Sequence, residues 1–166
     1  MKSKIFYESL SIHHADELFQ ILQSPEIYTY IPESPPVSLV ALEARYRELV
    51  VGASNGSGEV WLNWVIRDAK SREPIGQLQT TVKISEETAH LAYVIFPQFW
   101  GQGFASRSLD WLMNEISSKY TLSQFEAEID SRNTASIRVV QNRGFVKSHI
   151  KKTSVGSDII FIKKAL

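Results

Sequence analysis

The sequence predicts a mixed α/β fold in a single domain, and three observations support it. Apolar residues recur at helical spacing in some segments and alternate with polar residues in others. Two glycines one residue apart separate a predicted strand from a predicted helix. The 166 residues are 43% hydrophobic, which suffices for one core, and no repeat, linker or low-complexity segment divides the chain.

The N-terminal third is expected to contain one strand and two helices. A short strand is predicted over Ile5–Glu8, and apolar spacing predicts a helix over Asp16–Gln23. Residues 31–38 read as a loop, and Ser38 is expected to cap the second helix. The sequence GASNGSG, residues 52–58, marks the turn that ends this part of the chain.

Three strands and a long helix are predicted in the middle of the chain. The strands are expected at Val60–Ile66, Ile75–Val82 and His90–Phe96, the first two forming a hairpin across a polar connection. A helix from about Gly103 to Ser118 follows, because its apolar residues form one stripe.

The C-terminal part is expected to add a strand, a short helix and two more strands. Phe125–Asp130 alternates strictly between apolar and acidic residues, which predicts a strand. Asn133 or Thr134 is expected to cap the helix, and Gly144 to end it in the left-handed conformation. The last strands are predicted at residues 145–152 and 158–164.

Composition excludes several classes of function. Lys+Arg and Asp+Glu are equal at 18 each, so no overall field attracts nucleic acid or an anionic membrane. The chain has no cysteine, which excludes a disulfide, a thiolate nucleophile and a cysteine-based metal site, and no metal is expected. Neither a secretory signal nor a membrane-spanning run is apparent, so we expect a cytoplasmic protein without a membrane partner.

The glycine pair predicts an anion site at the start of the long helix. A helix N-terminus offers free N–H groups and a partial positive charge. Gly101 and Gly103, followed by the small Ala105 and Ser106, leave room for a phosphate to reach those groups. The alternative is a tight turn that simply needs glycine dihedral angles. The spacing matches neither the dinucleotide fingerprint nor the Walker loop. Trp100 and Phe104, beside the glycines, are expected to form a lip packed on the core.

Here the sequence resembles a known family. The segment 100–105, WGQGFA, is similar to the cofactor motif Q/R-x-x-G-x-G/A of the GNAT N-acetyltransferases. Trp100 replaces the usual Gln or Arg, as is typical of the branch that resembles ribosomal-protein alanine N-acetyltransferases. Segments 133–136 and 139–145 resemble the N-x-x-S…G-F element of the same branch. The likeness covers nearly the whole chain.

The resemblance implies a fold and a co-substrate. The fold would be a strongly twisted, mostly antiparallel sheet of six to seven strands with about four helices. A bulge in the strand His90–Phe96 and a splay from the next strand would open a slot. Acetyl-coenzyme A would place its pyrophosphate on the N–H groups of the glycine turn and its pantetheine arm along that strand. The implied contacts are Gly101, Gln102, Gly103, Phe104, Ala105, Ser106, Val94, Ile95, Phe96, Asn133 and Asn142.

The implied chemistry is direct attack of an amine on the thioester in a ternary complex, with the N–H near Ile95 as oxyanion donor. Glu128 is the expected base, because the alternation puts it on the polar face of its strand and a related group carries a glutamate there. Burial at the slot would raise the pKa of Glu128. The alternative is a solvated or cation-paired carboxylate. Asp130 is expected to stabilise a turn.

Ser136 is the expected donor to the leaving thiolate, since Val140 occupies the place where many relatives carry a tyrosine. The alternative for Ser136 is a helix-start hydroxyl that bonds the backbone. His90 is a candidate proton relay. Several aromatic side chains are candidates for an acceptor groove, although aromatics at such positions more often belong to the core: Tyr28, Tyr30, Trp61, Trp64 and Tyr93.

The sequence therefore predicts an acyltransferase that acetylates a primary amine, with a protein N-terminal α-amine as the favoured acceptor. The alternatives are an antibiotic or polyamine acetyltransferase, a non-catalytic acetyl-coenzyme A sensor, and an unrelated phosphate-binding α/β protein. The resemblance also implies that the chain can form a homodimer.

Overall fold

The computed structural model describes residues 4–165, which form seven strands, four α-helices and three short 3-10 helices. The strands are β1 Ile5–Ser9, β2 Glu59–Asp68, β3 Pro74–Lys83, β4 Thr88–Ile95, β5 Gln124–Asp130, β6 Val146–Thr153 and β7 Gly156–Lys164. The helices are α1 His14–Leu18, η1 Ile21–Gln23, η2 Pro25–Tyr28, α2 Leu39–Val51, η3 Pro97–Phe99, α3 Phe104–Ser117 and α4 Thr134–Gln141.

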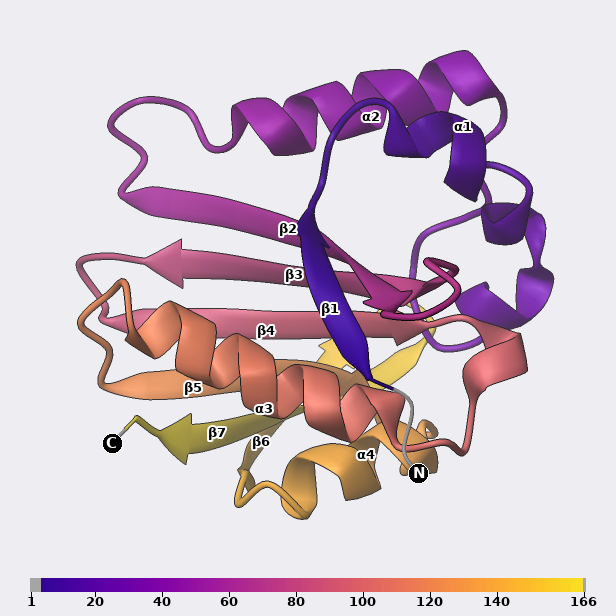
Figure 1. Cartoon of the computed structure of the whole chain (residues 1–166). Coiled ribbons are helices and arrows are strands. Elements are labelled where there is room, and N and C mark those ends of the chain that lie inside the picture. Colours follow the sequence, from indigo (N-terminus) through magenta and orange to yellow (C-terminus); the bar gives the residue numbers. More distant parts are fainter. Residues whose placement is uncertain (1–3, 166) are drawn as a thin grey trace.

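The strands form one sheet in the order β1-β2-β3-β4-β5-β7-β6 (Figure 1). Only β4 and β5 pair in parallel, and the other neighbours are antiparallel. Helices α3 and α4 lie against one face of the sheet (Figure 1), whereas α1 and α2 pack over the β2 end of the other. The mixed α/β fold is thus confirmed.

Two hydrophobic cores hold these layers together. The larger core fills the space between the sheet and α3, where Ile66, Leu78 and Leu112 are at most 1% exposed. The smaller core lies under α1 and α2 and includes the fully buried Leu18 and Phe96. Because each sheet face carries its own core, the strands between them are fixed from both sides.

The predicted helix caps are confirmed. Ser38 accepts a hydrogen bond from the Ala41 N–H at 3.1 Å, and Asn133 accepts one from the Ser136 N–H at 3.1 Å. Gly144 follows α4 with a φ of +81°, the left-handed conformation in which glycine avoids strain.

The expected helix over Asp16–Gln23 is wrong in its extent. The α-helix α1 covers only His14–Leu18, and two 3-10 turns carry the chain to Tyr28. Pro25 lies at the start of the second turn, and proline disfavours a helical conformation in the residue before it. The segment therefore forms short tight turns that bury Leu22 and Ile27 instead of one helix.

The bulge expected in the strand His90–Phe96 is also wrong. Strands β3 and β4 pair without a register shift from Gly76↔Ile95 to Lys83↔Thr88. The backbones approach closely there, since a Cβ at Gly76 would lie 2.2 Å from the Val94 carbonyl oxygen. Register shifts occur instead between β2 and β3, where β3 has the extra residue Ile75, and between β6 and β7.

The expected splay is confirmed. The parallel pairing of β4 with β5 covers three positions and ends at His90↔Glu126. Beyond that pair the strands diverge, although β4 continues to Ile95 and β5 to Asp130. The sheet thus opens in its middle rather than at an edge.

A buried arginine fixes the N-terminal segment to the sheet. Arg67 on β2 is 7% exposed, and its guanidinium hydrogen-bonds both carboxylate oxygens of Glu17 at 2.9 and 2.6 Å. It also bonds Glu8 on β1 and donates to the Arg72 carbonyl at 2.9 Å. This network joins β1, α1 and β2.

None of the helices in residues 4–165 combines the length and apolarity needed to cross a membrane.

Candidate active site

A cavity of about 540 Å³ lies where β4 and β5 diverge, and we call it the inner cavity. It extends from the start of α4, across the ends of β5, β4 and β3, to α2 and the loop after η2. Its lining includes several residues that the sequence singled out: Tyr28, Tyr30, Trp64, Tyr93, Val94, Glu128, Asn133 and Ser136.

The glycine turn before α3 has an open, backbone-built geometry. Gly101 and Gly103 have φ angles of +74° and +77°, so glycine dihedrals account for both residues. A Cβ on either would meet no atom within 4 Å, which means that the space above the turn is clear. Gly103 is the N-cap of α3 and has no side chain to bond the first N–H groups. A diphosphate therefore fits this turn.

The aromatic lip is only half confirmed. Phe104 is buried and packs edge-to-face on Phe99, with ring centroids 5.9 Å apart. Trp100, however, is 53% exposed, so the expectation that it packs on the core is wrong. Its indole N–H donates to the Ile95 carbonyl at 2.7 Å, because that carbonyl lies at the strand end where the ring can stay on the surface. Trp100 thus ties the turn to β4.

Fewer backbone N–H and C=O groups of β4 are free to bond a cofactor in the slot than the sequence predicted. The Phe96 N–H donates to the Ile75 carbonyl at 2.9 Å, and the Phe96 carbonyl accepts from the Phe99 N–H at 2.9 Å. Because antiparallel pairs alternate in direction, Val94 also turns its backbone groups to β3. Phe96 and Val94 are therefore unsuited to bond a pantetheine arm through the backbone, whereas the Ile95 N–H points to the side that β5 has left.

The start of α4 lies at the inner cavity. The side-chain oxygen of Asn133 accepts the hydrogen bond that caps the helix, so only its Nδ2 is available to bond a cofactor. The hydroxyl of Tyr93 donates to the Ser136 carbonyl at 3.5 Å, and burial raises the pKa of Tyr93. Ser136 is half-buried in the cavity wall. Asn142 is exposed at the far end of α4 and lines neither this cavity nor the second one.

Glu128 does not have the environment that the sequence predicted. Its side chain is 41% exposed and pairs with the Lys151 ammonium at 2.8 and 3.1 Å. Partial burial raises its pKa, but the hydrogen bonds of Lys151 and Asp158 outweigh that effect, and the net pKa lies below the usual 4.5. The expected upward shift of the Glu128 pKa is therefore wrong. The structure has the alternative, a carboxylate paired with a cation. Asp130 bonds the Arg132 N–H at 2.8 Å, which fits the expected turn.

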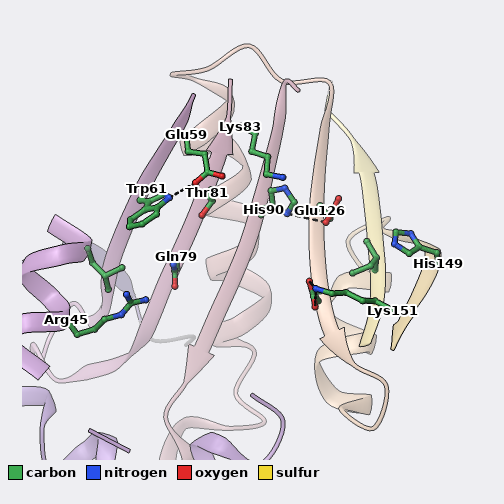
Figure 2. Close-up of a pocket in the computed structure, with 13 residues that line it drawn as sticks. Arg45, Glu59, Trp61, Gln79, Thr81, Lys83, His90, Glu126, His149 and Lys151 are labelled. Carbon is green, nitrogen blue, oxygen red and sulfur yellow. Dashed lines mark hydrogen bonds and ion pairs between the residues drawn. The ribbon is translucent and has the colours of Figure 1, made fainter. Parts of the chain in front are cut away.

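A second cavity, also of about 540 Å³, lies on the same sheet face between α2 and β6, and we call it the face cavity. Figure 2 shows its floor of polar side chains from β2 to β6. His90 Nδ1 lies 3.2 Å from a Glu126 carboxylate oxygen there (Figure 2). Its Nε2 is buried and has no hydrogen-bond partner among the described residues. Within the described residues, Glu126 is thus the one polar partner of this ring.

Sequence reasoning missed three polar residues of the inner cavity. Gln77 on β3 donates to the Tyr46 hydroxyl at 2.8 Å, and burial raises the pKa of Tyr46. Asn63 on β2 also lines the cavity, and its Nδ2 has no partner within residues 4–165. The alternation of IGQLQTTV could have placed Gln77 and Gln79 on the polar face. No local pattern points to Tyr46, which meets them only through the packing of α2.

The described residues contain no group of three or more His, Asp or Glu side chains that could hold a metal ion. The charges of the site are instead arranged in pairs, such as Lys151 with Glu128.

Comparisons with known proteins show which sequences and folds this chain is similar to. An N-acetyltransferase called p20 from Bacillus licheniformis is 24% identical over 147 residues, covering 87% of this chain and 80% of that protein. The structure of RimL, a ribosomal α-N-protein acetyltransferase in complex with coenzyme A, has a TM-score of 0.85 and 16% identity, with 99% of this chain and 95% of that one covered.

A spermidine N-acetyltransferase from Vibrio cholerae, in complex with coenzyme A and spermine, has a TM-score of 0.81 and 16% identity over 97% of this chain and 95% of that one. At such identities the solved structures show the fold alone. The family described as "Acetyltransferase (GNAT) domain" matches residues 4–146, most of the chain. With the fold, the splayed strands and this match together, the chain belongs to the GNAT family of acetyltransferases.

Proposed function

We propose that the protein transfers an acetyl group from acetyl-coenzyme A to the N-terminal α-amine of a polypeptide. The observation that carries the proposal is the early end of the β4–β5 pairing at His90↔Glu126. The divergence leaves an opening in the sheet, and the inner cavity passes through it from Ser136 at the start of α4 to Gln77 beside α2. The glycine turn begins α3, which lies on the same face of the sheet as α4 (Figure 1). A donor and an acceptor can therefore approach each other from opposite faces.

Acetyl-coenzyme A supplies the activated acetyl group. The residues expected to hold it are those of the glycine turn from Gly101 to Ser106, together with Nδ2 of Asn133. A Cβ on Gly101 or Gly103 would meet no atom within 4 Å, so the turn leaves room for the diphosphate. The Ile95 N–H is expected to donate to the acetyl carbonyl oxygen, because it points away from β3. The Ser136 hydroxyl is expected to donate a hydrogen bond to the leaving thiolate, which then takes its proton from solvent.

Glu128 keeps a role in this proposal, although a different one. With a lowered pKa it is a carboxylate throughout the neutral range, and a carboxylate can hold the incoming ammonium and the water that takes its proton. Lys151 limits its basicity, so proton transfer through water to solvent fits better than direct abstraction by Glu128.

The charge of the inner cavity favours an acceptor with one positive charge. Of the carboxylates in its lining, Glu128 pairs with Lys151 and Asp130 with Arg132 at 2.7 Å. Arg45 lines the cavity as well, opposite in charge to the remaining Glu33. A polyamine would find little net negative charge to bind, whereas a single α-amine needs little.

The second candidate is polyamine acetylation, which the likeness to the Vibrio cholerae spermidine enzyme favours. The two are tested by incubating the protein with acetyl-coenzyme A and either short peptides with free N-termini or spermidine, and measuring thiol release. We expect faster release with peptides. A higher kcat/KM for spermidine would overturn the proposed acceptor, and cofactor binding without amine-dependent release would favour a sensor.

A further inference from the structure

Of the residues that line the face cavity, only Glu128 and its partner Lys151 have a part in the reaction proposed above, yet this cavity continues the inner cavity. The two share four lining residues, which are Arg45, Leu49, Gln79 and Glu128. They therefore form one trough that begins where β4 and β5 diverge and runs over the sheet towards β2 and β6 (Figure 2).

The size of the floor suits an extended chain. From β5 to β2 it spans three strand spacings of about 4.8 Å each, or roughly 14 Å. Along β3, from Gln79 to Lys83, it measures roughly 13 Å at about 3.3 Å per residue. An extended peptide advances about 3.3 Å per residue, so about four residues would cross the floor in either direction.

The charges of the floor cancel. Its cations are Arg45, Lys83 and Lys151, and its carboxylates are Glu59, Glu126 and Glu128. Most of them have partners, since Lys151 bonds Glu128, His90 pairs with Glu126, and the Trp61 indole N–H donates to Glu59 at 2.9 Å. Such a surface attracts neither a polycation nor a polyanion strongly.

The uncharged side chains of the floor match the hydrogen-bonding pattern of a peptide backbone. Gln79 and Thr81 lie two residues apart on β3, so both point to the same face. Each carries a donor and an acceptor, and neither side chain bonds any other described residue. Trp61, which pairs with Thr81 in the register, adds a flat apolar surface. A peptide offers alternating N–H and C=O groups, whereas a polyamine offers donors only.

We propose that the face cavity binds the first residues of a polypeptide whose N-terminal amine reaches the inner cavity. This inference rests on the proposed function and deepens it, because it makes the acceptor an extended chain of about four or more residues rather than a small amine. Gln79 and Thr81 bond the backbone of that chain, and Trp61 packs on one of its side chains.

The first test is a length series of uncharged peptides, from a dipeptide amide to a hexapeptide, with the same N-terminal residue. We expect kcat/KM to rise about tenfold in total and to level off near four residues, which corresponds to one or two hydrogen bonds gained. Equal kcat/KM for all lengths would overturn the inference and leave the proposed function standing.

The second test is a substitution on the floor. Thr81→Val removes one hydroxyl at nearly constant volume, and we expect the ratio of hexapeptide to dipeptide kcat/KM to fall about fivefold. Trp61→Ala should reduce that ratio about tenfold. The matched control is Thr121→Val, an exposed threonine outside both cavities, which should keep the wild-type ratio. An unchanged ratio in Thr81→Val and Trp61→Ala would contradict the assignment.

The third test measures binding without catalysis. A hexapeptide already acetylated at its amine is titrated by calorimetry into wild type and Thr81→Val. If no amine is acetylated but this peptide binds the wild type and binds Thr81→Val about fivefold more weakly, the proposed function fails and the face-cavity assignment stands. If the peptide does not bind the wild type, the assignment fails whatever the enzyme acetylates.

Discussion

The two sides of the sheet opening are built in different ways. On the α3 side, the glycine turn is shaped by backbone dihedral angles at Gly101 and Gly103, and its bonding groups are peptide N–H groups. On the other side, the trough is made of side chains from α2, β2, β3, β5 and β6. A backbone site depends on a few adjacent residues, whereas a side-chain site depends on how distant segments pack. One side can therefore be changed without the other.

The largest expected effect is on the α3 side. Gly103→Val forces a β-branched residue into a φ of +77° and puts its side chain into the clear space over the helix N-terminus. We expect the Kd for coenzyme A to rise at least about 100-fold by calorimetry. The matched control is Gly56→Val, which has a φ of +82° and equally open surroundings but lies in the turn before β2. Equal coenzyme A affinity in both variants would contradict the role of the glycine turn.

On the other side, a change at Arg67 is expected to weaken the attachment of β1 and α1 to β2, which is one of the strands of the trough. Arg67→Met leaves Glu17 and Glu8 without their shared cation, and we expect the free energy of unfolding to fall by about 3 kcal/mol. Urea unfolding at neutral pH measures it. Arg45→Met, which loses only an exposed pair with Glu48, is the control and should lose less than about 1 kcal/mol.

The same network predicts a pH dependence. Hydrogen bonds from Arg67 hold the pKa values of Glu8 and Glu17 below their ordinary 4.5. A carboxylate with a lowered folded-state pKa contributes stability above its unfolded pKa, and this stability is lost as the pH falls through the folded value. The wild type should therefore lose stability below about pH 4.5, and Arg67→Met should lose less. Parallel pH profiles of the two proteins would contradict the linkage.

A smaller effect is expected from Glu128→Gln. The cofactor Kd should stay constant while kcat/KM for peptides falls about tenfold, because the carboxylate that holds the ammonium is lost. The pKa of Glu128 is lowered, so its titration lies below 4.5, and the rise in rate near neutral pH should follow the acceptor amine, whose pKa is about 7.7–8.0. The variant should thus keep the shape of the profile between about pH 6 and 9.

Glu115→Gln is the matched control, since Glu115 on α3 pairs with Lys119 just after that helix and lines neither cavity. A rate equal to wild type in Glu128→Gln would remove Glu128 from the mechanism. A shifted midpoint near neutral pH would show that Glu128 titrates there, contrary to its pairing with Lys151.

The smallest effect is expected from Ser136→Ala. It removes the proposed hydrogen-bond donor to the leaving thiolate, but water can replace a hydroxyl at the cavity wall, so we expect a fall in kcat of about five- to tenfold. Thr134→Ala, an exposed position in the same helical turn, should leave kcat unchanged. A drop in helix stability with constant kcat in Ser136→Ala would favour a structural role.

The contrast between the two sides also explains what the sequence could predict. Local patterns predicted several features at the residues where the structure has them. They are the glycine turn, the caps at Ser38 and Asn133 and the alternation of β5. The environment of Glu128 was not predictable, because its partner Lys151 lies 23 residues away on a strand that enters the sheet beyond β7. The sequence shows that Glu128 is on a polar face, but only the strand order shows what faces it.

Strand β6 forms one margin of the sheet, and its residues are almost all exposed. Lysines on an edge strand oppose the addition of a further strand, because each lysine would lose its hydration or lie close to another cation. Lys151 is one of these lysines, and it is also the partner of Glu128. Protection of the sheet edge and the lowered pKa of Glu128 thus depend on one ammonium group, so a variant made to alter either property would shift both.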